Sequence, residues 1–407
     1  MNLIRLKHLV STRITTGASE SAGDYSADDT RYIRISDFDG NGNIREEVKV
    51  SIPNSKAENY LLNENDILIA VTGGTVGKSM IFNLSEKSAY AGYLARIRTN
   101  KKLNYKYLWY FLNSPLFEKW RRESINISTI ENISAGKYAN LPVYYQNIEN
   151  QLVIVEKLDK SFLKIKQLIY NQQHQIEKLK EYKQSLISKF FNRFVYDLIE
   201  CKNEISDDAS PLHHFCEVVR GNTGFKKDEL IEEGEFVGLQ YGKIYQTDVV
   251  DSLYNYYVDS KFFKENQVVE KGDVILISTS ETIEDLGHVC FYNRDKLGLL
   301  GGEQFVLKPN QEILNGKFLY YCTIEFSKYI KKYCTGLKVY RFNSTHLKNI
   351  YISAPDIDEQ KRVVNHLDKK MFEIDSLLNI KETKIKKLID YKQSLIYEYV
   401  TGKKSVV

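Results

Sequence analysis

The amino-acid sequence predicts an α+β fold in which two similar globular domains alternate with two long helices that pair as an antiparallel coiled coil. The first observation is an internal repeat, because the segment Tyr182–Ile187 recurs letter for letter as Tyr391–Ile396, 209 residues later. The second is a heptad pattern of apolar residues that runs through both copies of this segment. The third is a set of short apolar segments, rich in β-branched and aromatic residues, ahead of each helical copy.

The repeat also sets the expected domain boundaries. The helical copies align without a gap, whereas the matches ahead of them drift in spacing, as expected where loops vary around a retained scaffold. Among these weaker matches, Asp66–Ile69 corresponds to Asp273–Leu276, and Tyr107–Tyr110 corresponds to Phe318–Tyr321. The predicted parts are a first domain, a central helix, a linker, a second domain and a C-terminal helix, at residues 1–147, 148–195, 196–211, 212–356 and 357–407.

Strand signals dominate each globular domain. The clearest predicted strands are Asp66–Val71, Tyr93–Arg98, Val274–Ser278 and Glu303–Lys308. One short helix is expected at Tyr105–Asn113, with a counterpart at Gly316–Phe326. The class is therefore α+β with helical spacers.

Polar residues interrupt the apolar seam of each long helix at the same two places. They are Gln172 and Lys183 in the first helix and Lys381 and Lys392 in the second. Such residues can fix the register and orientation of a coiled coil at some cost in stability. The alternative is that the lysine stems lie along the seam edge and carry their charges to water. Each helix of about 45 residues would be roughly 65 Å long, so antiparallel pairing is expected to place the domains at opposite ends, related by a pseudo-two-fold axis.

Composition and charge indicate a globular protein of a reducing compartment. The net charge of +4 permits contact with nucleic acid but does not demand it. The five cysteines include no C-x-x-C pair, which argues against a disulfide framework and against a zinc finger. The sequence shows neither a signal peptide nor an apolar run of about 20 residues. We therefore expect a cytoplasmic protein without a membrane role.

One segment resembles a phosphate-binding loop but does not meet its requirements. Thr72–Ser79 follows a predicted strand and ends in Gly-Lys-Ser, yet Thr72 occupies the place of the first required glycine. The aligned segment of the second domain, Ser278–His288, lacks Gly-Lys-Ser and carries three carboxylates. Nucleotide binding is therefore not expected. The alternative is that this loop approaches DNA and that Lys78 meets a phosphate.

Other apparent catalytic motifs fail on spacing. Asp356 and Glu359 are too close in sequence for their carboxylates to come from adjacent strands around one Mg²⁺, so Asp356 or Asp358 is expected to cap a helix. No two prolines are adjacent, which excludes the Asn-Pro-Pro-Tyr motif of adenine methyltransferases. The sequence thus predicts no catalytic residue in this chain.

A metal site is not expected either. His213, His214 and Cys216 lie close in sequence, but Cys216 aligns with Val10 and is better interpreted as a small buried residue. The remaining histidines have no partners at ligand spacing. No metal and no cofactor are therefore expected in this chain.

Basic residues interleaved with aromatic residues in presumed loops are the candidate DNA contacts. Lysine and arginine neutralise phosphates, and arginine reads guanine at the base edges. The alternative for any one lysine is an ordinary solvated charge, but the sets recur at matched places in both domains. The candidates are Lys78, Arg121, Arg122, Lys137, Tyr138, Lys331, Lys332, Lys338, Tyr340 and Arg341.

Several features together resemble the specificity subunits of type I restriction-modification systems and cover essentially the whole chain. They are the duplicated layout, the strand and glycine-containing loop at Asp66–Lys78, and the helix entries Glu149–Gln151 and Asp358–Gln360. The repeated Leu-Asp-Lys and Tyr-Lys-Gln-Ser-Leu-Ile runs complete the match. No single motif is specific, but the ordered set is.

The resemblance implies two target recognition domains, each reading one half of a split double-stranded DNA site, with the paired helices setting the separation. It also implies two methylation subunits on the helices, which supply adenine N6 methylation from S-adenosylmethionine. Motor-nuclease subunits, which use ATP and Mg²⁺, would join for cleavage. None of these activities would reside in this chain. One departure from the family pattern is the loop with Glu281, Glu284 and Asp285, where carboxylates replace the basic and glycine-rich residues.

Two other classes of function remain open from the residues alone. A coiled-coil adaptor would bind proteins through the globular domains and would not recognise a DNA sequence. An enzyme with an unrecognised site would show turnover as the purified chain.

Overall fold

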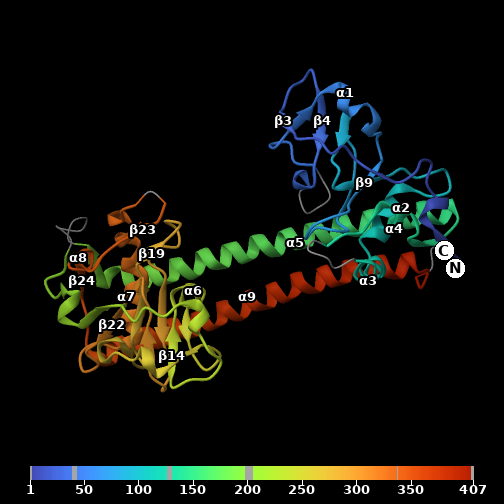
Figure 1. Ribbon diagram of the computed structural model, residues 1–407. Helices are drawn as coiled ribbons and strands as arrows, with labels where there is room; N and C mark the ends of the chain where they lie inside the picture. Colours follow the sequence, from blue (N-terminus) through green and yellow to red (C-terminus); the bar gives the residue numbers. More distant parts are fainter. Residues whose placement is uncertain (1, 39–43, 126–130, 198–204, 337, 405–407) are drawn as a thin grey trace. The chain divides into compact units, whose positions relative to one another are not determined.

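The computed structural model describes residues 2–38, 44–125, 131–197, 205–336 and 338–404 (Figure 1). The chain divides into two compact units, Met1–His174 with Lys381–Val407 and Gln175–Ile380. Two helices of 44 residues each, α5 (Ile148–Phe191) and α9 (Ile357–Val400), contribute a segment to both units. Each unit therefore holds one globular domain and one part of each long helix, and the two units are described separately.

The globular part of the first unit is built on two four-stranded sheets. Its strands are β1 (Asn2–Arg5), β2 (Thr15–Thr16), β3 (Gly23–Asp24), β4 (Thr30–Ile33), β5 (Val50–Ile52), β6 (Ile67–Ala70), β7 (Ser79–Ile81), β8 (Ser88–Tyr90), β9 (Leu94–Ile97) and β10 (Pro142–Tyr145). One sheet has the antiparallel order β2-β9-β6-β7, and the other has the order β3-β5-β4-β8, in which β4 and β8 are parallel. β1 pairs with β10. All four residues of β6 are buried, as expected of a central strand that packs on both faces.

The second unit repeats this plan with longer sheets. Its strands are β11 (Val195–Asp197), β12 (Ser210–Pro211), β13 (Cys216–Arg220), β14 (Phe236–Leu239), β15 (Val249–Val250), β16 (Tyr257–Val258), β17 (Val268–Val269), β18 (Val274–Ile277), β19 (Thr279–Ser280), β20 (Val289–Tyr292), β21 (Gly298–Leu300), β22 (Gln304–Pro309), β23 (Tyr340–Arg341) and β24 (Ile350–Ile352). The main orders are β13-β22-β18-β20-β15 and β16-β14-β21-β17, and β14 runs parallel to β21. The central strand β18 is fully buried, like β6.

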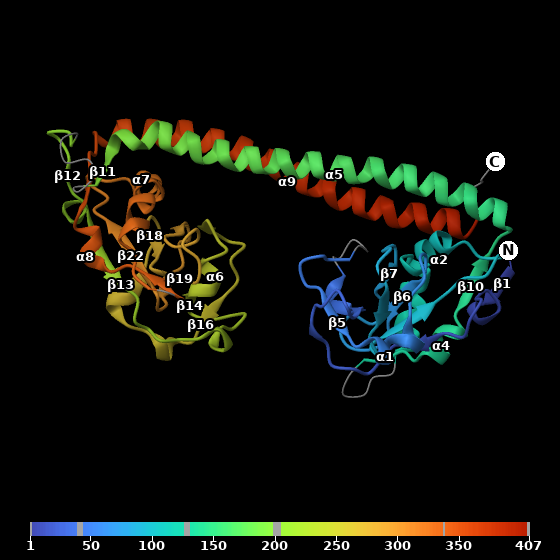
Figure 2. The ribbon, with the colours of Figure 1, turned by 90° about the horizontal axis from the view of Figure 1, so that it is seen from above.

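In each unit one short helix, which the sequence predicted, joins the central sheet to the long helices. α2 (Tyr105–Leu112) and α7 (Gly316–Ile330) pack on the central sheet of their own unit and lie between it and the long helices (Figure 2). Asn104 and Asn315 cap them, with side-chain oxygens that accept hydrogen bonds from first-turn amides. The main apolar cluster of each unit thus includes residues of the sheet, the short helix and both long helices.

A buried glutamine in the first turn of each long helix clamps the short helix. In the first unit Gln151 accepts a hydrogen bond from Asn104 N (2.8 Å) and donates to the carbonyls of Lys102 and Gln146. In the second unit Gln360 forms the same three bonds with Asn315 N, Ile313 O and Pro355 O, at 2.8, 2.9 and 2.7 Å. Both glutamines are fully buried, so each is held by a complete set of partners. The repeated glutamine in the helix entries is therefore a structural clamp.

A second repeated contact lies two turns further along. The aspartate of each Leu-Asp-Lys run accepts a hydrogen bond from a tyrosine hydroxyl of the short helix, Tyr110 to Asp159 and Tyr321 to Asp368. A lysine at the start of the same short helix completes each group, at 2.7 Å from Asp159 and 3.2 Å from Asp368. These contacts explain why the sequence repeats this motif.

The long helices pair antiparallel within each unit. In the first unit, Val155 and Leu158 near the start of α5 share an apolar cluster with Leu395 and Tyr399 near the end of α9. Gln172 and Lys381 both belong to this unit, and Gln172 is 8% exposed. The half-buried Lys392 lies 4.7 Å from the centre of the Phe162 ring, and burial, together with the charge of Lys166, lowers the pKa of Lys392.

The second unit treats the equivalent lysine differently. Lys183 of α5 forms an ion pair of 2.7 Å with Asp375 of α9 and lies 3.9 Å from Asp248. Asp375 is the repeat counterpart of Lys166, so the same seam position faces an acid in one unit and a base in the other. An ion pair across the helices supports the register interpretation for Lys183, whereas Lys392 follows the alternative of a stem packed along the seam.

Part of the stretch predicted as a linker pairs with the second domain. β11 and β12 lie on either side of β24, and both register on Ile352. Residues 198–204 of the predicted linker lie outside the described residues. Two smaller predictions are confirmed: Asp356 caps α9 through a 2.8 Å bond from Glu359 N, and Cys216 is buried, with its pKa raised to about 12 by burial.

Candidate DNA interface

In each unit four segments meet beside the ends of the two parallel strands. We call these segments the rim. In the first unit rim 1 consists of residues 34–35, 71–78, 91–93 and 131–132, and in the second unit rim 2 consists of residues 240–241, 278–288, 301–303 and 340–341. The main loop of each rim follows a strand that the apolar pattern of the sequence predicts, Asp66–Val71 or Val274–Ser278, so the position of that loop is set by the scaffold.

Several backbone hydrogen bonds of rim 1 have a counterpart in rim 2. The residue after the central strand donates to the tip of the strand connection, Val71 N to Tyr93 O (2.9 Å) and Ser278 N to Glu303 O (3.1 Å). The residue after the second parallel strand donates back to the first, at 3.0 Å from Ala91 N to Ile33 O and from Gly301 N to Leu239 O. This correspondence identifies equivalent residues where the sequences differ.

A glycine closes the rim loop in both units. Gly77 N donates to Ala70 O and Gly287 N donates to Ile277 O, at 3.0 and 3.1 Å. Their φ angles are +88° and +77°, a conformation that favours glycine. The sequence aligned Ser278–His288 with the glycine loop only as a weak match, and the structure shows that the two loops also share this closing glycine. The enclosed loops have six residues (71–76) and nine residues (278–286), so a linear alignment loses the match.

The loop Thr72–Ser79 is not built as a phosphate-binding loop. A phosphate loop presents free amides and leads into a helix, whereas here the strand β7 follows directly. The amides of Gly73, Val76, Gly77 and Lys78 donate to carbonyls of the chain itself. The loop therefore belongs to a strand connection, and the exposed Lys78 side chain is its outward charge.

Of the DNA contacts predicted in the first domain, Lys78 lies in rim 1, and Arg121 and Arg122 lie in a helix next to it. Arg121, in α3 (Pro115–Ser124), packs on Gly77, where an added Cβ would lie 2.3 Å from the arginine Cδ. Arg121 and Arg122 each pair with Glu118 at 2.8 Å, and hydrogen bonds from Arg121, then Arg122, lower the pKa of Glu118 to about 2. Because the Arg122 side chain is 75% exposed and that of Arg121 only 22%, Arg122 is the better placed to meet a phosphate.

The remaining two DNA contacts predicted in the first domain, Lys137 and Tyr138, lie in α4 (Ala135–Ala139). Lys137 Nζ donates to Ser124 O at 2.7 Å, so this lysine ties α4 to the end of α3. Tyr138 is fully buried and its hydroxyl donates to Ala70 O at 2.8 Å. The assignment of Tyr138 to a DNA-contacting surface was therefore wrong, because the side chain fills the core under the loop.

Rim 2 collects the candidates of the second domain. Lys331 donates to the carbonyl of Glu284 in the rim loop, and burial lowers its pKa. Tyr340 and Arg341 form β23, which pairs with Thr279 and Ser280 of the rim loop. The side chains of Lys332 and Lys338 are exposed nearby in the sequence. The structure thus brings Lys331, Tyr340 and Arg341 to one loop.

The sequence analysis missed the residues at the centre of each rim. Tyr93 and Glu303 occupy equivalent tips, and their side chains are 61% and 46% exposed. Arg34 and Gln240 follow the equivalent strands β4 and β14. A signal was present, because Tyr93 and Glu303 each follow a glycine and begin a predicted strand in their domain.

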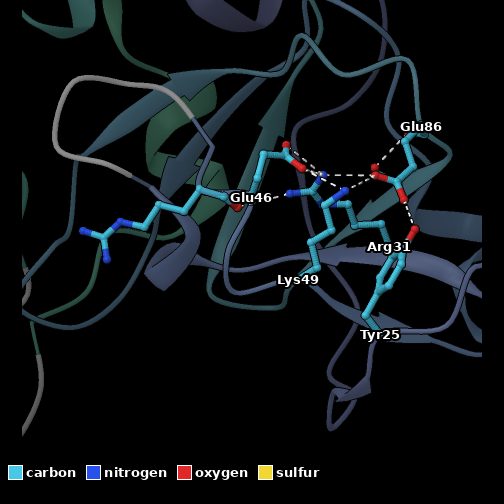
Figure 3. A network of polar contacts seen from close by, with 7 residues as sticks. Tyr25, Arg31, Glu46, Lys49 and Glu86 are labelled. Carbon is cyan, nitrogen blue, oxygen red and sulfur yellow. Dashed lines mark hydrogen bonds and ion pairs between the residues drawn. The ribbon is translucent and has the colours of Figure 1, made fainter.

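A polar network in the first unit lies near the starts of β4, β5 and β8 (Figure 3). The guanidinium of Arg31, whose side chain is 3% exposed, lies between Glu46 (3.1 Å) and Glu86 (3.0 Å). Lys49 joins Glu46 at 2.8 Å, and the Tyr25 hydroxyl donates to Glu86 at 2.5 Å. Hydrogen bonds from Lys49 and Arg31 lower the pKa of Glu46. The buried guanidinium of Arg31 has both of its carboxylate partners within this network, so we interpret the network as structural and not as a reading site.

The described part of the chain contains no candidate metal site and no candidate membrane span. No group of three or more His, Cys, Asp or Glu side chains in that part of the chain could hold a metal ion. Over the same residues, no helix is both long and apolar enough to cross a membrane.

A scaffold that is duplicated in detail but differs between copies at its exposed rims is typical of a protein that recognises a two-part target. The chain matches the family described as the type I restriction modification DNA specificity domain over residues 11–178 and 208–390. Because these residues make up most of its length, the chain belongs to this family. The prediction of a type I DNA specificity subunit is confirmed.

Individual relatives agree with this membership. The chain is 25% identical over 367 residues to the type I restriction enzyme MjaVIII specificity subunit of Methanocaldococcus jannaschii, covering 84% of this chain and 80% of that protein. One solved structure is described as giving the structural basis underlying complex assembly and conformational transition of the type I R-M system. A chain of that structure has a TM-score of 0.75 at 14% identity, and the match covers 99% of this chain and 98% of that chain. The HsdS subunit from Thermoanaerobacter tengcongensis has a TM-score of 0.54 at 14% identity, covering 99% and 97%. At such identities the solved structures show the fold alone.

Proposed function

We propose that this chain is a non-catalytic DNA reader in which each globular domain recognises one half of a split double-stranded site. The observation that carries the proposal is the pair of identical mountings, in which Gln151 and Gln360 clamp each domain to the long helix that follows it. Each mounting carries a rim with different side chains. Two identical mountings with two different rims suit a target made of two unlike halves, separated by a gap that depends on the helices.

We propose that two methylation subunits dock on the long helices. Large apolar side chains are exposed at the same three repeat positions of both helices. The pairs are Leu163 (70%) with Phe372 (75%), Leu168 (44%) with Leu377 (46%), and Tyr182 (53%) with Tyr391 (52%). Exposed apolar side chains that recur at matched positions indicate an interaction surface present twice, and therefore two copies of one partner.

Catalysis is assigned to those partners. The methylation subunits would transfer a methyl group from S-adenosylmethionine to an adenine N6, and motor-nuclease subunits with ATP and Mg²⁺ would cut DNA. The chain itself would supply only sequence recognition and assembly, and it would act in the cytoplasm, where the DNA is accessible. Turnover of any of these reactions by the purified chain alone would contradict this assignment.

The recognition proposal is tested by mapping N6-methyladenine. The chain is expressed with its methylation subunit in a host that lacks DNA methylation, and the subunit expressed alone is the control. We expect a new split motif that is methylated only when both proteins are present. A soluble complex without a new motif would instead favour the coiled-coil adaptor.

The docking proposal is tested by co-purification. Leu163→Glu is expected to leave one methylation subunit per chain, and the combination with Phe372→Glu is expected to leave none. Burying one such side chain contributes about 1.5–3 kcal/mol, so each loss should weaken binding more than tenfold. Lys164→Glu, at an exposed position beside Leu163, is the matched control and should keep two. Retention of two subunits by the double variant would exclude these positions from the interface.

A further inference from the structure

The two rims share the backbone hydrogen bonds described above and carry different side chains at three equivalent positions. The first is the residue after the first parallel strand, Arg34 in rim 1 and Gln240 in rim 2. The second is the tip of the strand connection, Tyr93 and Glu303. The third is the residue that forms a β-bridge with the threonine near the start of the rim loop. It is Asn132, opposite Thr72, in rim 1 and Arg341, opposite Thr279, in rim 2. The paired threonines are identical, whereas the side chains at the three outer positions all differ.

We infer that these three positions are the base-reading positions of each domain, and that rim 2 reads a C·G base pair through Glu303 and Arg341. The inference rests on the proposed function, because it names the residues by which the proposed reader recognises its site. Glutamate accepts a hydrogen bond from cytosine N4, and arginine donates to guanine O6 and N7. The two partners of one C·G pair thus match the two side chains.

The geometry at Glu303 suits this role. Arg341 Nε lies 3.9 Å from Glu303 Oε2, and the Thr279 hydroxyl donates to the same oxygen. No hydrogen bond to Glu303 Oε1 forms within the described part of the chain, so this oxygen is an available acceptor. The side chains of Glu303 and Arg341 are 46% and 62% exposed. A fixed carboxylate with one available oxygen beside an exposed guanidinium presents one acceptor and a set of donors at the same edge.

The backbone at this tip is also unusual. Glu303 has a φ of +62°, which side chains other than glycine rarely adopt, although two glycines precede it. Beneath it, the fully buried Gln304 donates its amide to Leu239 O, while its Oε1 finds no partner in the described residues. The equivalent residue of the first unit is the apolar Leu94. Strain and an unsatisfied polar atom at one tip indicate a segment shaped for recognition at some cost to stability.

Rim 1 has the chemistry to read a different set of bases. Asn132 carries an amide of the kind that reads adenine N6 and N7, and Tyr93 presents an exposed aromatic hydroxyl. Arg34 is held by Asp37 and by Val48 O, both at 3.0 Å, which fixes its guanidinium at the rim. Because no carboxylate stands at these three positions in rim 1, the first half-site need not contain a C·G pair at the same place.

The experiment maps N6-methyladenine in the same host with Glu303→Gln, Arg341→Ala and Tyr93→Ala, each with the methylation subunit. We expect Glu303→Gln and Arg341→Ala to lower discrimination at one C·G pair of a single half-site by about tenfold, with the other half-site unchanged. Tyr93→Ala is expected to alter only the other half-site. Glu312→Gln, an exposed glutamate beyond the opposite end of β22, is the matched control and should keep the wild-type motif.

The outcomes separate the two proposals. If the wild-type chain yields no split motif, the proposed function fails before any variant is tested. If the wild-type motif appears and the Glu303 and Arg341 variants keep it unchanged, or change an A·T pair, the base-reading inference is overturned. If a variant abolishes methylation, its binding to duplexes that carry each of the four base pairs at the affected position is measured. Uniform loss across the four duplexes would also overturn the inference.

Discussion

Two equivalent aspartates at the start of the central strands provide a sharp test of how each unit is stabilised. Asp66 is 1% exposed and accepts two hydrogen bonds of 2.7 Å from Arg98. Asp273 is 4% exposed, and within the described residues its side chain accepts one hydrogen bond, from Glu270 N at 2.8 Å. Burial raises the pKa of Asp273 to about 6, against which the Glu270 amide and the charge of Lys308 act only partly. The buried carboxylate of the second unit thus lacks the arginine partner that stabilises the equivalent carboxylate of the first unit.

The magnitude follows from the difference in pKa. A folded value of about 6 against 3.8 for the unfolded chain corresponds to about 3 kcal/mol, because the folded state favours the protonated carboxyl. The contribution is unfavourable above pH 6, and stability falls as the pH rises from about 3.8 to 6. We expect Asp273→Asn to stabilise the second unit at pH 7.5 by about 1 kcal/mol or more, since the buried amide needs a partner of its own. The gain should vanish near pH 4.

The assay is urea unfolding followed by circular dichroism between pH 4 and pH 8. Asp66→Asn is the matched control, and it should destabilise the first unit by about 3 kcal/mol because it leaves Arg98 without its partner. A variant Asp273→Asn that is no more stable than wild type at pH 8, or whose gain does not depend on pH, would refute the reasoning.

Three further predictions concern the clamp, the seam and the rim. Gln360→Ala removes three hydrogen bonds and should cost about 3 kcal/mol, with faster amide exchange at the start of α7 as the readout; unchanged exchange would show that the clamp is dispensable. Lys166→Asp should place an acid opposite Lys392, as Asp375 stands opposite Lys183. The free energy of unfolding should rise by up to about 1 kcal/mol, and this gain should shrink with added salt. No gain in urea unfolding at low salt would contradict the pairing. Arg122→Glu should weaken DNA binding and lower the salt slope by about one per lost phosphate contact, whereas equal affinity and slope would remove this arginine from the interface.

The sequence predicted the parts of the fold that depend on periodicity. The heptads located the seam of α5 and α9, and the apolar segments located the central strands, because buried positions repeat at the period of the element. The repeated Gln and Leu-Asp-Lys residues were recognised as a pattern, but their role required the structure. Gln360 acts on Asn315, 45 residues away, and no local signal connects the two.

The misassigned residues lacked such a period. Tyr138 lies in a five-residue helix beside Lys137, and it faces the core while the lysine reaches Ser124 O at the end of α3, so adjacency to a lysine was misleading. The equivalence of Gly287 to Gly77 was not recognised because the loop before Gly287 is three residues longer than the loop before Gly77. β11 and β12 are short and lie beside acidic residues, so their pairing with β24 depends on tertiary contacts.

The strain at Glu303 allows recognition to be separated from folding. Glycine adopts a φ of +62° without steric cost, so Glu303→Gly should leave the second unit as stable as wild type or more stable by up to about 1 kcal/mol. The same change removes the carboxylate, so discrimination at its C·G pair should fall as it does for Glu303→Gln. Urea unfolding and methylation mapping on one preparation would measure both effects. A marked loss of stability would show that the contacts of Glu303 with Thr279 and Arg341 hold the fold, and that the carboxylate is kept for structure rather than for reading.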